Sequence, residues 1–110
     1  MAVPPPYVAI ADPNRWVVRH GFPLEWKLRR LGFSRWLPGL PFEVSYRKPL
    51  PFDRMGELAA RLRDLGLTFS AGHGWSPSEV VQFLRDEGHF AGPFTEIAWG
   101  RDGMWVLRQL

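Results

Sequence analysis

The chain has 110 residues, a formal net charge of +3 at neutral pH and no cysteine. This length suits a single domain, 1–110, with its own core, and a hydrophobic content of 45% with six tryptophans and eight phenylalanines excludes a disordered chain. The absence of cysteine excludes disulfides, thiolate nucleophiles and cysteine-based zinc sites.

The sequence shows neither a signal peptide nor an apolar run long enough to span a membrane, so we expect a cytoplasmic protein. Arginine greatly outnumbers lysine, amides are scarce and 11 residues are proline, a composition compatible with a thermophilic source. Charge is uneven: residues 1–50 carry eight Lys and Arg and three acidic residues, whereas residues 51–110 carry six and eight. A basic half predicts an anionic partner.

Residues 1–6 form a proline-rich arm, in which Pro4-Pro5-Pro6 favours an extended conformation. Short β runs at 7–11 and 15–20 flank Asp12-Pro13-Asn14, a strong turn sequence, and together predict an N-terminal hairpin. In the second run Trp16 alternates with Val17 and shares a face with Val18. Residues 23–31 predict a short helix, with Leu24, Leu28 and Leu31 on its apolar stripe and Gly32 at its end.

Residues 42–48 alternate as a half-buried strand, and a helix follows that opens at Pro51 and closes at Gly66. Glu57 and Arg61 are spaced to form an ion pair on that helix. A strand at 67–71 precedes a glycine-rich loop at 72–75. The third helix is capped by Ser76 and ends at Gly88, and strands at 95–99 and 104–109 form a C-terminal hairpin. The apolar stripe of the second helix comprises Met55, Leu58, Ala59, Leu62 and Leu65.

The order is therefore β-β-α-β-α-β-α-β-β, which predicts an α+β domain with a mixed sheet, terminal hairpins and about three helices. The segment 42–71 predicts a right-handed parallel crossover. The strand, loop and helix over 67–88 are expected to form the centre of the core.

Two sequence patterns are candidate functional sites. In the first, the loop from Gly72 to Ser78 precedes a helix N-terminus, where free backbone N–H groups attract anions. Its candidate anion ligands are Gly72, His73, Gly74, Ser76 and Ser78. The spacing matches neither GxGxxG nor a P-loop, Glu79 repels an anion, and the glycines and serine are also explained by turning and capping.

No sequence motif for a metal or for nucleophilic catalysis is present, so we expect neither an enzyme nor a cofactor. An enzyme or phosphate-ligand binder that uses the Gly72–Ser78 loop stays as an alternative.

In the second pattern, tryptophans alternate with basic residues in the first third of the chain, a combination enriched in binding hot spots and in single-strand nucleic-acid sites. The opposing interpretation places the tryptophans in the core and the arginines on a solvated rim. We predict a small, non-enzymatic regulatory protein that docks on a macromolecule, first of all a protein with an acidic face and alternatively a nucleic acid. The predicted partner-binding residues are Trp26, Lys27, Arg29, Arg30, Arg35 and Trp36.

Overall fold

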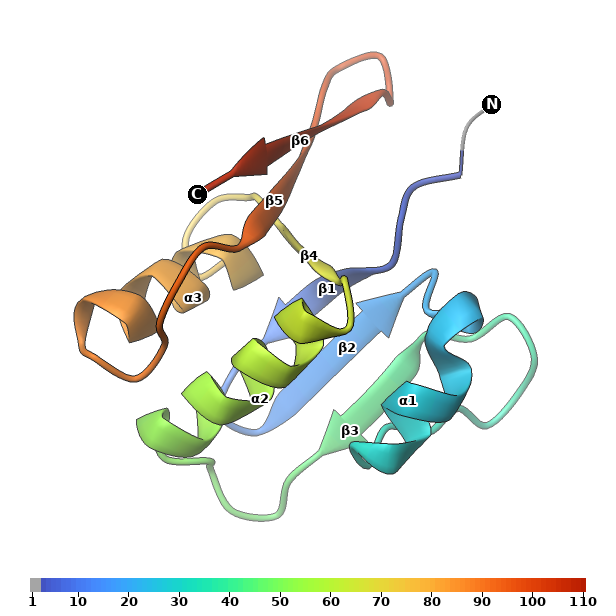
Figure 1. The fold of residues 1–110 in the computed structure, drawn as a ribbon. Coiled ribbons are helices and arrows are strands. Elements are labelled where there is room, and N and C mark those ends of the chain that lie inside the picture. Colours follow the sequence, from blue (N-terminus) through green and yellow to red (C-terminus); the bar gives the residue numbers. More distant parts are fainter. Residues whose placement is uncertain (1–2) are drawn as a thin grey trace.

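A computed structural model describes residues 3–110 and shows a six-stranded mixed sheet with helices on one face (Figure 1). The elements are β1 (Tyr7–Ala11), β2 (Arg15–Arg19), the 3-10 turn η1 (Phe22–Leu24), α1 (Glu25–Arg30), β3 (Phe42–Ser45), α2 (Phe52–Asp64), β4 (Thr68–Ser70), α3 (Pro77–Asp86), β5 (Thr95–Trp99) and β6 (Trp105–Gln109). The predicted α+β class and both terminal hairpins are confirmed. Of the predicted arm, residues 1 and 2 lie outside the described chain, and residues 3–6 form no regular element.

The strand order is β3-β2-β1-β4-β5-β6. β1 pairs antiparallel with β2 and parallel with β4, and β4 pairs parallel with β5. β3 and β4 therefore run parallel, as the crossover prediction requires, but they are not neighbours, because the N-terminal hairpin lies between them. Thr68 anchors this arrangement, since its N–H and its hydroxyl both donate to the carbonyl of Pro6, at 3.1 and 3.2 Å.

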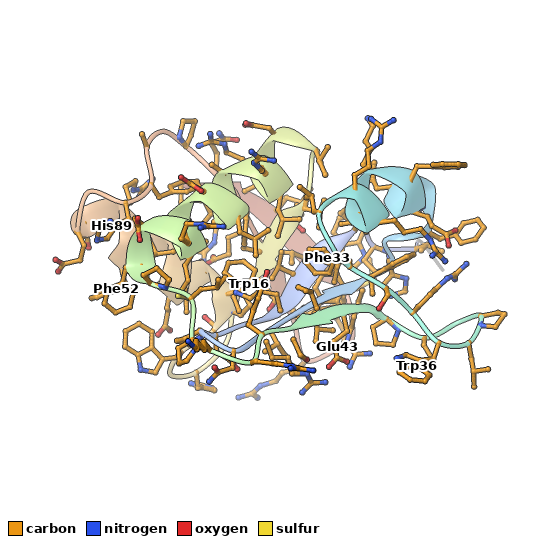
Figure 2. All side chains as sticks on the ribbon, turned by 90° about the horizontal axis from the view of Figure 1, so that it is seen from below. Trp16, Phe33, Trp36, Glu43, Phe52 and His89 are labelled. Carbon is orange, nitrogen blue, oxygen red and sulfur yellow. The ribbon has the colours of Figure 1, made fainter. Side chains whose placement is uncertain are left out.

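The main core lies between the helices and one sheet face, and Trp16, Val18 and Phe69 are fully buried in it. The predicted alternation of β2 is confirmed: Val17 is buried but lies outside this core, on the other face. Figure 2 shows α1 and α2 above the sheet. Burial of alternate residues on both faces explains why β2 has a nearly continuous apolar sequence.

The predicted helix stripes also lie in this core. Met55, Leu58, Ala59 and Leu62 of α2 are buried, and Leu65 packs against them. α2 and α3 both end at a glycine with positive φ, Gly66 at 93° and Gly88 at 82°, which is the left-handed conformation that favours glycine. No helix within residues 3–110 is long and apolar enough to cross a membrane.

Several strand ends differ from the sequence prediction by one residue, and the boundaries of β3 and α1 differ by more. The strand expected over 42–48 ends at Ser45, because the chain then wraps around the β1–β2 turn. The N–H of Tyr46 donates to the carbonyl of Asn14 at 2.7 Å, and the N–H of Leu50 donates to Pro13 at 2.8 Å. The helix expected from residue 23 becomes α-helical only at Glu25, after a 3-10 turn that contains Pro23. Both changes are local and leave the element order unchanged.

Candidate interaction surface

The predicted surface is built on α1, a six-residue helix held by one buried side chain. Leu28 is fully buried, whereas Trp26, Lys27, Arg29 and Arg30 are exposed. A helix this short is marginal alone, so the packing of Leu28 and of the flanking Leu24 and Leu31 against the core holds it in place. Apolar contacts hold one side of α1 against the core, and the opposite, polar side therefore faces solvent.

The three tryptophans of the first third have different environments. Trp16 is fully buried, whereas Trp26 on α1 is 82% exposed and Trp36 in the following loop is 92% exposed. Of these three tryptophans, Trp16 alone belongs to the core. Leaving two indoles in solvent forgoes burial free energy on the order of 3 kcal/mol each. That is a substantial fraction of the net stability of a small domain, about 5–15 kcal/mol.

Arg35 connects the loop of Trp36 to α1 and is not a freely solvated charge. Its side chain is only 17% exposed, and its Nη2 lies 3.1 Å from Oε1 of Glu25. Its guanidinium also lies 5.4 Å from the ring centroid of Phe22 and 5.2 Å from that of Phe42. These contacts combine an ion pair with cation–π attraction, so Arg35 orders the surface on which the tryptophans stand.

The remaining cations of α1 divide into paired and unpaired groups. Arg29 Nη2 also lies 3.1 Å from Oε1 of Glu25, so one carboxylate is shared by Arg29 and Arg35. Neither Lys27 nor Arg30 has an ion-pair partner within the part of the chain that the structure describes. Lys27 and Arg30 are therefore the charges of α1 that are open to a partner.

These two side chains line a cleft of about 470 Å³ between α1 and α2. Arg61 of α2 lines the same cleft. The expected ion pair between Glu57 and Arg61 is not formed, since Glu57 pairs with Arg54 at 3.6 Å. The one acidic residue in the lining, Asp64, is paired with a neighbouring arginine of α2 at 3.1 Å. Arg61 was not among the predicted partner-binding residues, because only tertiary packing places it next to α1.

The Gly72–Ser78 loop lies at the carboxyl ends of β1 and β4. Ser76 Oγ accepts from the N–H of Glu79 at 3.4 Å, so it caps α3, and the buried hydroxyl of Ser78 donates to Glu96. Gly72, His73 and Ser76 line a hollow of about 390 Å³ together with Asp12, while Gly74 adopts a φ of 68°. A carboxylate in the hollow and the absence of Lys or Arg from its lining disfavour an anion.

The histidines are dispersed. His20 lies against Tyr7, with ring centroids 5.9 Å apart, and His89 lies against Phe52 at 6.1 Å. Within residues 3–110 no group of three or more His, Asp or Glu side chains is placed to hold a metal ion.

Arg15 of β2 forms an exposed ion pair with Glu43 of β3, so it is not among the unpaired cations. Arg15 Nε lies 2.8 Å from Glu43 Oε1, and this hydrogen bond lowers the pKa of Glu43 below its usual value. The same hydrogen bond raises the pKa of Arg15. Arg15 is thereby held against the sheet face opposite the helices.

No family model, curated protein or solved structure matches the chain.

Proposed function

We propose that this protein is a small interaction module that docks on a protein partner with an acidic face. The contact surface comprises α1, the α1–α2 cleft and the loop of Trp36, and it is called the basic end below. The proposal depends on two observations: Trp26 is exposed on α1 together with the unpaired cations Lys27 and Arg30, and Trp36 is exposed in the loop that follows α1. Indole anchors flanked by arginines are the side chains that most often dominate binding free energy at protein interfaces.

Three kinds of group contribute to binding at the basic end. Trp26 and Trp36 supply apolar area, and Lys27, Arg30 and Arg61 supply charge that steers an acidic partner. Arg35 and Glu25 supply order, since their ion pair joins the loop to α1 before any partner arrives. A surface that is ordered in the free protein loses less entropy on binding.

The test is capture of partners by the immobilised parent chain and by a double variant, Trp26→Ala with Arg30→Ala. A partner that fits the proposal is acidic, is released progressively by salt, and binds the double variant at least tenfold more weakly. The matched control is Trp99→Ala with Arg101→Ala, which removes the same residue types from the β5–β6 hairpin. Equal loss in both variants, or no loss in the first, would overturn the proposal.

Nucleic acid is the alternative partner for the same surface, and the unpaired cations of the cleft are the observation that favours it. Phosphate contacts release counterions, so this alternative requires an affinity for single-stranded DNA or RNA that falls steeply with salt. Arg30→Glu would then weaken binding strongly. Fluorescence anisotropy with labelled oligonucleotides measures this affinity. Equal binding by the parent and by Arg30→Glu would exclude nucleic acid as the partner of this surface.

A further inference from the structure

A second concave region lies at the opposite end of the molecule from Trp36. Figure 2 shows Phe52 and His89 at that end. A hollow of about 400 Å³ opens there between the β1–β2 turn, the start of α2 and α3, a size within the range of about 300–1,000 Å³ typical of small-ligand pockets. Its lining is apolar apart from Asp12 and includes Met55 and Val80. This hollow is called the aromatic pocket below.

Three rings form walls of this pocket at steep angles to one another. Trp75 and Phe83 have centroids 5.5 Å apart and an interplanar angle of 89°, and Phe52 and Phe83 are 5.3 Å apart at 70°. Trp75 is 71% exposed and Phe52 is 49% exposed. Ring faces that are fixed by edge contacts and still reach solvent present negative electrostatic potential to a ligand.

Asp12 is the charged residue of the lining, and its carboxylate is fixed. Its Oδ1 accepts from the N–H of Asn14 at 2.9 Å and from the N–H of Arg15 at 2.7 Å. Its Oδ2 has no hydrogen-bond partner within residues 3–110. The guanidinium of Arg15 lies near enough to interact with Asp12, but it is hydrogen-bonded to Glu43. The pocket therefore keeps a carboxylate oxygen that is available to a positively charged group.

Acidic residues near the pocket offset the helix dipoles. α2 and α3 begin near it, and their N-terminal dipoles would attract an anion. Each of these helices carries an acidic residue in its first turn, Asp53 and Glu79, which opposes that attraction. The adjoining hollow at the Gly72–Ser78 loop shares Asp12 and Trp75 and contains no Lys or Arg in its lining.

The aromatic pocket lies at a position in the sheet where ligands often bind in open α/β sheets. β1 leaves the sheet toward its hairpin partner β2, whereas β4 leaves through α3 to β5 on the other side. The carboxyl ends of these adjacent parallel strands diverge there, and such switch points form ligand crevices in open sheets. The pocket therefore combines concavity, aromatic walls and a fixed carboxylate at that place.

We propose that the aromatic pocket binds a small organic cation, an ammonium group that carries alkyl substituents. The cationic nitrogen lies between Asp12 and the faces of Trp75 and Phe52, and the alkyl groups contact Met55, Val80 and Phe83. The site is separate from the basic end, so it neither requires nor replaces the docking function.

The experiment compares two probes of the same shape, choline and its uncharged carbon isostere 3,3-dimethylbutan-1-ol, by amide and indole chemical shifts of the labelled full-length chain. Choline is expected to shift the Trp75 indole and the amides around Asp12, with an affinity at least about fivefold above that of the isostere. Equal affinities, shifts that map elsewhere, or no shifts at the highest soluble concentration would overturn the proposal.

Two variants locate the charge and the aromatic contribution. Asp12→Asn keeps the acceptor that caps the turn and removes the charge, so it should weaken choline binding by about five- to thirtyfold and leave the isostere unchanged. Asp102→Asn is the matched control, because Asp102 Oδ1 accepts from the N–H of Met104 at 3.0 Å in a similar turn. Trp75→Ala should weaken choline binding comparably. Retained binding in Asp12→Asn or Trp75→Ala would contradict the proposal.

Discussion

Replacing Gly56 with alanine is expected to destabilise the protein, although this substitution normally stabilises a helix. Gly56 lies in the interior of α2 and is buried against the segment that follows α3. A Cβ atom added there would lie 1.8 Å from the carbonyl oxygen of His89 and 2.7 Å from its carbonyl carbon, both closer than the 3.0 Å that real Cβ atoms keep. Because these are backbone atoms, no side-chain rotation relieves the contact.

Two opposing contributions decide the magnitude. Alanine is better than glycine inside a helix by about 1 kcal/mol. To admit the methyl group, α2 and the segment at His89 must separate by more than an ångström, which opens the packing between α2 and α3. Overpacking of this kind costs about 1–3 kcal/mol and occasionally more, and displaced backbone belongs at the upper end. We therefore expect a net loss of about 1–3 kcal/mol in the free energy of unfolding.

Urea unfolding followed by circular dichroism measures this loss. Gly72→Ala is the matched control, because its Cβ would meet only the Cβ of Ser76 at 3.4 Å, an ordinary contact. That control is expected to change stability by no more than about 1 kcal/mol, and toward stabilisation. If Gly56→Ala were as stable as the parent, the close approach of α2 to His89 would be refuted.

Three further outcomes are expected. Ser78→Ala removes the hydrogen bond that Ser78 donates to the buried Glu96, so the free energy of unfolding should fall by about 1–3 kcal/mol, and a neutral result in urea would contradict this contact. Burial raises the pKa of Tyr46 above the usual value of 10.0. In Tyr7→Phe, Tyr46 is the remaining tyrosine, so the phenolate absorbance of this variant should titrate with a midpoint above 10.0. A midpoint at or below 10.0 would contradict the burial of this side chain. The pKa of Glu43 is lowered by its arginine partner, so its stabilisation is present above the usual pKa of 4.5 and is lost as pH falls through the lower folded value. The free energy of unfolding of Glu43→Gln should therefore be lower than that of the parent near neutral pH and equal to it in acid. A difference that persists in acid would contradict the ion pair of Glu43 with Arg15.

The class and order of elements could be predicted because they depend on local patterns. The Asp12-Pro13-Asn14 turn, the leucine stripe of α2 and the Ser76 cap each specify their element within a few residues. Strand adjacency could not be predicted in the same way. Nothing in the segment 42–71 indicates that two strands from the N-terminus lie between β3 and β4, since that contact joins residues far apart in the chain.

The surroundings of the candidate site residues could be predicted only in part, for the same reason. The spacing of Leu24, Leu28 and Leu31 predicts the apolar side of α1, and Lys27 and Arg30, which lie off that stripe, are exposed. The same pattern left open whether Trp26 is buried or exposed. The sequence did not indicate that Arg35 would be held by Glu25 and two phenylalanine rings, because that contact joins three separate elements.

The sequence by itself determined the secondary structure, the imbalance of charge and the absence of thiol chemistry, all of which follow from composition and short-range periodicity. Tertiary structure alone decided which tryptophan is core and which are solvated, and it placed Arg61 in the cleft beside α1. It also places the Gly72–Ser78 loop next to Asp12, so the hollow beside this candidate anion loop has a carboxylate in its wall. The physical reason is that burial and electrostatic environment are set by neighbours in space, and those neighbours come from segments that the sequence keeps apart.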